Sequence, residues 1–158
     1  MNVVVKELPE QEVAFIRRTG SYFEPQDHWQ KLIHWANEHA LFPPQHAFIG
    51  ISLDNPDVVE SNHCRHDACV TIPKDFDKEE HIDMQFKKLD GGLYALYPFY
   101  DTPEKLNLAY KYMFEQWLPE SEYDADDNRY NLEFSRNNPL EDPEGKLKVD
   151  LFVPIKSV

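Results

Sequence analysis

The feature that most constrains the fold of this chain is an internal repeat. The segment VAFIRRTG (13–20) aligns with YALYPFYD (94–101) at an offset of 81 residues, which also places Trp29 on Tyr110. A two-residue insertion then aligns ISLDNP (51–56) with FSRNNP (134–139), and we expect the offset to return to 81 for CVTIP (69–73) on DLFVP (150–154). Because a repeat defines the unit of a fold, the sequence predicts one domain over 1–158, made of two copies at about 1–75 and 80–158.

Each copy has the pattern of two strands, a helix and two further strands. NVVVKEL (2–8) and HIDMQFKKL (81–89) open the copies, and Pro9-Glu10 and Gly91-Gly92 are expected to turn the chain into the next strand. In the second copy Thr102 can cap a helix that has Pro103 at its first position. Apolar residues at helical spacing follow in both copies: Trp29, Leu32, Ile33, Ala36 and Ala40, then Leu106, Ala109, Tyr110, Met113 and Trp117.

These patterns predict an α+β fold. We expect a duplicated ββαββ module (SHS2-like) with pseudo-twofold symmetry, antiparallel sheets, two main helices and a central groove. Each copy has a single helix to cover its sheet, so packing the copies together would hide the remaining apolar faces and leave a seam, where ligand sites are common.

The composition excludes several classes of protein. With 158 residues, 41% of them hydrophobic, the chain can bury one core, and its apolar runs are too short to span a membrane. A net charge of −13 repels phosphate backbones and attracts cations, which argues against nucleic-acid binding by this chain alone. The start lacks the pattern of a secretory signal, and Cys64 and Cys69 are too few for a disulfide scaffold, so we expect a cytoplasmic protein with free thiols.

Glu133 is the candidate central residue of a binding site. It lies between Leu132 and Phe134 in a predicted strand, so if those two pack under the helix, the carboxylate faces the groove. A buried carboxylate is costly unless its pKa rises, an Arg or Lys pairs with it, or a cationic ligand does. The alternative is that Glu133 simply faces solvent at the sheet surface. Its repeat counterpart is Gly50, which would leave a cavity and favours the site interpretation.

Aromatic residues surround the presumed groove. Aromatic faces attract organic cations by cation–π interaction, although aromatic residues in strands are also ordinary core residues. The candidate ligand-binding aromatics are Tyr22, Phe23, Tyr94, Tyr97, Phe99, Tyr100 and Tyr130.

Other chemistries fit the sequence less well. In HCRHDAC (63–69), strand alternation points Cys64 and His66 away from His63 and Cys69, so four metal ligands would not converge. Cysteine is more often a small buried hydrophobe than a nucleophile, and there is no Gly-rich phosphate loop. We therefore expect neither a metal nor a cofactor.

Six segments together resemble the GyrI-like small-molecule-binding family, the module that also forms the effector-binding domain of AraC-type and MerR-type multidrug regulators. They are IGISLDNP, CRHDACVTIP, GGLYALYPFYD, FEQWLPESEYD, LEFSRNNP and VDLFVPI, spread from Phe15 to Ile155. The resemblance implies a groove with a central glutamate that meets cationic, lipophilic ligands. That glutamate corresponds to Glu133, and the groove aromatics correspond to Tyr22, Tyr100 and Trp117. Two departures, Ser135 and His66 where many relatives carry an aromatic residue, bear on the ligand spectrum and leave the fold untouched.

Three functions are consistent with these observations. The favoured one is a stand-alone binding protein for cationic, lipophilic or aromatic compounds. The second is a hydrolase of cyclopropane-bearing or related electrophilic toxins, with Glu133 as the catalytic residue, as some members of the family are. The third is a protein-interaction role such as inhibition of DNA gyrase, as in the family's namesake. Because the resemblance covers nearly all of the sequence, we expect no helix-turn-helix for DNA within it. Binding and hydrolysis would use the same residues, so the sequence does not separate them.

Overall fold

The computed structural model describes residues 2–138 and 141–158, which form two compact units. Unit 2 runs from Glu10 to Asp90, and unit 1 combines the segment up to Pro9 with the chain from Gly91 onward. The expected α+β class is confirmed, with antiparallel strands throughout and one main helical segment in each unit.

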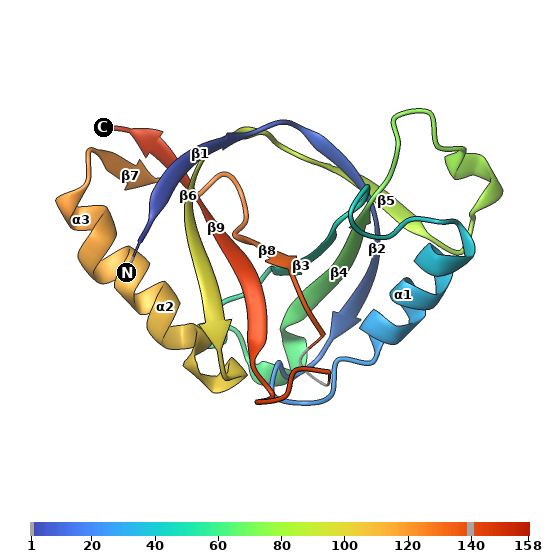
Figure 1. Ribbon diagram of the computed structural model, residues 1–158, viewed down its shortest axis with the longest axis horizontal. Coiled ribbons are helices and arrows are strands. Elements are labelled where there is room, and N and C mark those ends of the chain that lie inside the picture. Colours follow the sequence, from blue (N-terminus) through green and yellow to red (C-terminus); the bar gives the residue numbers. More distant parts are fainter. Residues whose placement is uncertain (1, 139–140) are drawn as a thin grey trace. The chain divides into compact units, whose positions relative to one another are not determined.

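Unit 2 contains four strands in the order β3-β4-β2-β5. They are β2 (Gln11–Thr19), β3 (Phe48–Ser52), β4 (Arg65–Thr71) and β5 (Gln85–Leu89), with the short helices η1 (Ser61–His63) and η2 (Lys78–Glu80) in the connections. The helix α1 (His28–Glu38) packs against β2 and β4, as Figure 1 shows. Its apolar stripe and the inward faces of the strands form one buried cluster, which includes Ala14, Leu32, Trp35, Ala36, Ala68 and Val70.

Unit 1 contains strands in the order β1-β6-β9-β8, with β7 pairing with another part of β9. They are β1 (Val4–Leu8), β6 (Gly92–Asp101), β7 (Tyr123–Ala125), β8 (Leu132–Ser135) and β9 (Leu147–Ser157). A helical segment covers one face (Figure 1) and is made of η3 (Pro103–Lys105), α2 (Leu106–Tyr112), the π-helix η4 (Met113–Trp117) and α3 (Leu118–Glu120). Under it lies a second cluster, which includes Ala95, Phe99, Ala109, Met113, Val149, Leu151, Val153 and Ile155.

The opening strands of the two sequence copies are exchanged. β1 pairs with β6, whereas β5 pairs with β2, so Pro9-Glu10 and Gly91-Gly92 do not close the hairpins that the sequence suggested. Pro9-Glu10 cannot form a tight hairpin turn for a steric reason. Such turns need a positive φ at their first central residue, and the ring of Pro9 fixes φ near −65°. The chain therefore crosses from one unit to the other at these two points.

The strand registers show the duplication more clearly than the few identical residues of the two copies do. Leu8 pairs with Gly92 and Leu89 with Gln11, an offset of 81 on both sides of the ladder. Phe15 pairs with Cys69 in unit 2, and the corresponding Leu96 pairs with Phe152 in unit 1, so the last strands match at an offset of 83. The expected return to 81 is therefore wrong. A shift of two residues keeps every side chain on the same face of a strand, so the hydrophobic pattern alone cannot fix it.

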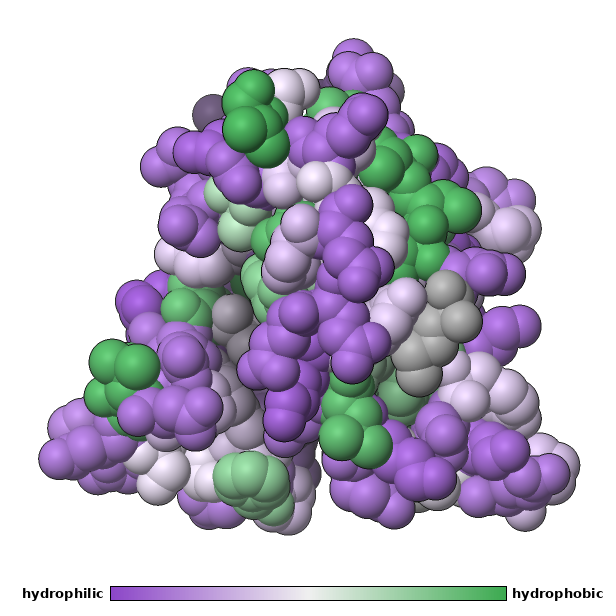
Figure 2. All heavy atoms as spheres, turned by 90° about the vertical axis from the view of Figure 1, so that its left-hand side faces the viewer, coloured by the Kyte–Doolittle hydropathy of each residue, from purple (hydrophilic) through white to green (hydrophobic). Residues whose placement is uncertain are grey.

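The surface on the side of the unit 1 helices is mostly hydrophilic. Figure 2 shows hydrophobic side chains at several separate places among hydrophilic ones, which agrees with the net charge of −13. Among the described residues, no helix has the length and apolar character needed to cross a bilayer.

Candidate functional site

Glu133 lies on the face of the sheet that the helix covers. It pairs with Leu151, a member of the cluster under α2, so both side chains point toward the helix. Leu132 and Phe134 point the other way, and the Phe134 ring meets that of Phe152 at a centroid distance of 5.0 Å. The condition under which Glu133 would face away from the helix, that Leu132 and Phe134 pack under it, is therefore not met. Alternation fixes that Glu133 and its neighbours face opposite sides, but not which side carries the helix.

Tyr110 of α2 is the partner of Glu133. Its hydroxyl donates a hydrogen bond of 2.7 Å to Glu133 Oε2, and both residues are half-buried. The sequence placed Tyr110 in the apolar stripe and missed this polar contact. The repeat could have indicated this contact. Tyr110 aligns with Trp29, and Glu133 aligns with Gly50. In each copy the helix residue lies over the strand residue.

The electrostatics of this pair follow from burial. Burial raises the pKa of Glu133 above its ordinary value, against the lowering effect of the Tyr110 hydrogen bond. Burial, followed by the charge and hydrogen bond of Glu133, raises the pKa of Tyr110 well above its ordinary value, so its hydroxyl stays protonated as a donor. In the part of the chain that the structure describes, no Lys, Arg or His forms an ion pair with Glu133.

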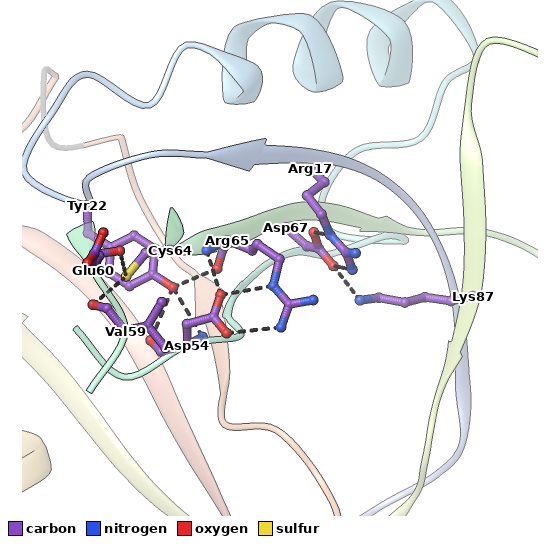
Figure 3. Close-up of polar contacts among 9 residues, drawn as sticks. All are labelled: Arg17, Tyr22, Asp54, Val59, Glu60, Cys64, Arg65, Asp67 and Lys87. Atoms are coloured by element: carbon purple, nitrogen blue, oxygen red, sulfur yellow. Dashed lines mark hydrogen bonds and ion pairs between the residues drawn. The ribbon is translucent and has the colours of Figure 1, made fainter. Parts of the chain in front are cut away.

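Asp67 in unit 2 shows how this chain satisfies a buried carboxylate when it does so internally. Its side chain is fully buried. The Arg17 guanidinium donates to Oδ1 at 2.8 Å and to Oδ2 at 3.0 Å, and Lys87 Nζ lies 2.5 Å from Oδ2 (Figure 3). Burial acts to raise the pKa of Asp67, but the hydrogen bonds from the two cations outweigh it and hold the pKa below its ordinary value. Glu133 has a neutral donor where Asp67 has two cations.

Further aromatic side chains pack against the cluster under α2, on the same face of the sheet as Glu133. Tyr97 pairs with Leu151, which pairs with Glu133, so the three residues stand side by side on three adjacent strands. The Tyr112 ring lies 6.3 Å from that of Tyr97, and Trp117 packs half-buried against the same cluster. Trp117 ends the π-helix, a feature that is frequent at functional sites.

The other predicted aromatics of unit 1 lie elsewhere. Tyr94 and Tyr100 point to the face opposite the helix, because Ala95 and Phe99 between them point toward it. Tyr94 is buried beneath the guanidinium of Arg129, 4.6 Å from its ring centroid. Tyr100 is half-exposed, and its hydroxyl donates to Asp142 at 2.8 Å. A third, Tyr130, is exposed. Tyr94 and Tyr100 therefore lie on the face of the sheet opposite Glu133.

In unit 2, Tyr22 has a structural hydroxyl. It donates to the carbonyl oxygen of Arg65 at 2.6 Å and accepts from the Asp54 N–H at 3.3 Å, and Figure 3 shows this junction together with the Asp54–Arg65 ion pair. Burial raises the pKa of Tyr22. Its neighbour Phe23 is 89% exposed and so contributes nothing to a buried site within the unit.

The space over Gly50 is filled rather than open. A Cβ at Gly50 would lie 3.3 Å from His66 Nε2 and 3.3 Å from the Trp29 ring. His66 Nδ1 is also 2.7 Å from His28 Nε2, and burial lowers the pKa of His66 to about 4, so the pair is neutral at pH 7. The expected cavity is therefore absent at this residue. A side chain at this position would require the Trp29 ring and the His66 imidazole to shift by a few tenths of an ångström.

The cysteine and histidine motif is divided between elements. Cys64 is buried just before β4 with its Sγ toward the carbonyl oxygens of Val59 and Glu60, and Cys69 is buried in β4, where burial raises its pKa to about 12. Residues 2–138 and 141–158 contain no group of three or more His, Cys, Asp or Glu side chains placed to hold a metal ion.

Comparison with known proteins places these features in a family. The sequence model of the GyrI-like small molecule binding domain matches residues 1–156. The SPbeta prophage-derived protein YosT of Bacillus subtilis, whose name describes a transcriptional regulator, is 28% identical over 118 residues, which cover 73% of this chain and 77% of YosT.

Solved structures share the fold at low identity. The C-terminal domain of EcmrR is 17% identical with a TM-score of 0.73, over 99% of this chain and 98% of that domain. In the EcmrR–DNA complex the match spans only 58% of the EcmrR chain, with a TM-score of 0.74. SAV2435, solved bound to tetraphenylphosphonium, is 12% identical with a TM-score of 0.64, over 99% of this chain and 94% of that one.

Proposed function

This chain belongs to the GyrI-like family of small-molecule-binding domains, and from that premise we propose that it captures cationic, lipophilic compounds with the Glu133 carboxylate as their charge partner. The bound compound would supply the positive charge that the described residues around Glu133 do not.

The observation that carries the proposal is the contrast between Glu133 and Asp67. Asp67 is paired with two cations and its pKa is lowered, whereas Glu133 meets a single neutral hydroxyl and its pKa is raised. A desolvated carboxylate of this kind is an energetic cost to the folded protein. A bound cation would supply the electrostatic interaction that the desolvated carboxylate lacks. The site should therefore bind cations in preference to neutral compounds.

The surroundings suit a cation with a large apolar body. Leu151 pairs with Glu133 on the helix face, Tyr97 lies on the far side of Leu151, and Trp117 packs against the same cluster, so apolar and aromatic surface lies on the same face as the carboxylate. A protein of the same fold, SAV2435, was solved with tetraphenylphosphonium, a delocalised cation of this type.

Calorimetric titration with tetraphenylphosphonium tests the proposal. Wild type should bind, and Glu133→Gln should weaken binding by at least tenfold, about 1.4 kcal/mol. Glu115→Gln is the matched control, because Glu115 is exposed on the π-helix and its substitution removes the same charge. This variant should bind within about twofold of the wild-type affinity. Equal affinity of wild type and Glu133→Gln would contradict the proposal, as would equal loss in both variants.

A hydrolase is the second candidate, because a carboxylate whose pKa is raised above its ordinary value is better suited to act as a general base on water. Mass spectrometry after incubation with a cyclopropane-bearing electrophile separates the two. Recovery of intact compound supports binding alone, and a product heavier by one water that Glu133→Gln does not form supports hydrolysis. If no cationic compound binds, a protein partner such as DNA gyrase becomes the leading proposal.

A further inference from the structure

A cavity of about 540 Å³ lies within unit 2, built entirely from its own residues. Three segments and one strand residue form its wall: the start of β2, the loop before β3, the end of β4 with the residues that follow it, and Lys88 of β5. The lining residues are Glu10, Gln11, Glu12, Pro44, Gln45, His46, Ala47, Thr71, Ile72, Lys74 and Lys88. A cavity of this size accommodates a small organic molecule.

The lining of this cavity contains two lysines, Lys74 and Lys88, and two glutamates, Glu10 and Glu12, and each glutamate is paired with a lysine. Lys78 Nζ lies 2.8 Å from Glu12 Oε2, and Lys88 Nζ lies 3.5 Å from Glu10 Oε1. The third cation, Lys74, forms no ion pair with any acidic residue of the described chain. The hydrogen bond from Lys78, followed by the charges of Lys78, Lys88 and Lys74, lowers the pKa of Glu12 despite its burial, so all three cations act on the same place.

The charges of the lining balance, unlike those of the whole chain. Two lysines and two glutamates line the cavity, whereas the whole protein carries a net charge of −13. Because Lys78 and Lys88 pair with the two glutamates, the ammonium of Lys74 is left to attract an anion.

Neutral donors complete the wall. Thr71 Oγ1 accepts the N–H of Ala47 at 3.0 Å and lies 3.3 Å from His46 Nδ1. This contact with the Thr71 hydroxyl holds the His46 imidazole at the cavity wall. Gln45, whose side chain carries an amide, is also part of the lining. Donors next to an ammonium are what a carboxylate or phosphate oxygen requires.

The geometry points to this cavity as a second ligand site, distinct from Glu133, that binds an anionic group of a small molecule, a phosphate or a carboxylate, with Lys74 as its charge partner. The site does not depend on the proposed capture of cations, because all its residues belong to unit 2 and Glu133 belongs to unit 1.

Amide NMR spectra of the full chain test this site, titrated separately with inorganic phosphate and with succinate at constant ionic strength. We expect saturable shifts centred on the amides of His46, Ala47 and Thr71. Lys74→Gln should weaken binding by about fivefold, as expected for loss of one direct charge partner. Lys31→Gln is the matched control, because Lys31 is exposed on α1 and carries the same charge; it should change affinity by less than about 1.5-fold.

Each outcome decides a specific point. Saturation by phosphate alone assigns a phosphate-bearing ligand, and saturation by succinate alone or by both probes assigns a carboxylate-bearing ligand or a general anion site. Shifts that grow linearly with probe concentration, or equal losses in Lys74→Gln and Lys31→Gln, overturn the proposal. Glu133→Gln should leave the titration unchanged, so failure here is distinguishable from failure of the cation site.

Discussion

The hydrogen bond from Tyr110 to Glu133 can be measured directly by a double-mutant cycle. The cycle compares wild type, Tyr110→Phe, Glu133→Gln and the double variant. Phenylalanine keeps the ring that packs against the sheet and removes only the hydroxyl 2.7 Å from Glu133 Oε2. Glutamine keeps the shape of the glutamate and removes its charge, so the cycle isolates the charged hydrogen bond.

The expected coupling follows from the chemistry of the pair. A hydrogen bond to an ionised group contributes about 1.5–3 kcal/mol to stability, against about 0.5–1.5 kcal/mol for a bond between neutral groups. Because the two residues are half-buried, we expect the lower part of the charged range, about 1.5–2 kcal/mol at neutral pH. At a pH below the raised pKa of Glu133 the carboxyl is protonated, and the coupling should fall to about 1 kcal/mol or less.

Urea unfolding followed by far-UV circular dichroism at two pH values gives the four free energies of unfolding. Tyr112→Phe is the matched control, because Tyr112 lies on the same helix with its ring against Tyr97 and no hydroxyl hydrogen bond among the described residues. Its coupling to Glu133→Gln should be zero within about 0.3 kcal/mol. A coupling for Tyr110 that is equally small at neutral pH would refute the assignment of this pair.

Three further predictions rest on other features. Affinity for tetraphenylphosphonium should rise with pH through the raised pKa of Glu133 and then level off, because only the ionised carboxylate attracts a cation; calorimetry across that range would contradict this if Glu133→Gln showed the same profile. Asp67→Asn should lower the free energy of unfolding by about 3 kcal/mol at pH 7, because two cations lose their partner. Since the folded-state pKa of Asp67 is depressed, its contribution is present above the ordinary value of 3.8 and is lost as pH falls through the depressed pKa, so the two proteins should converge in acid. Gly92→Ala should cost about 2–3 kcal/mol in urea unfolding, because φ is +141° and the new Cβ would lie 2.6 Å from Arg129 Nη1; Gly145→Ala, at φ +66° in open space, should cost about 1 kcal/mol.

The sequence predicted the elements of each module well and their pairing less well. Helical spacing and strand alternation are local, so the strands, both helices and the repeat could be predicted from them. The exchange of β1 and β5 could not, because it depends on which distant strand offers a free edge. The hydrophobic pattern around Leu132 and Phe134 likewise identified two faces without revealing which one the helix covers.

The site shows the same division. Glu133 stood out because a carboxylate among apolar neighbours is unusual on its own. Tyr110 did not, since a tyrosine in an apolar stripe packs well whether or not its hydroxyl finds an acceptor. The aromatic residues were predicted from abundance, and only contacts in space separate Trp117 on the helix face from Tyr94 and Tyr100 on the other.

The exchanged opening strands also set the order in which the chain can fold during synthesis. β1 is made first, yet its partner β6 begins at Gly92, so β1 leaves the ribosome without a partner while more than 80 residues are translated. Unit 2, by contrast, is one continuous segment that is complete once β5 has emerged. Unit 2 can therefore fold first, and the segments on either side of it then assemble the unit that holds Glu133.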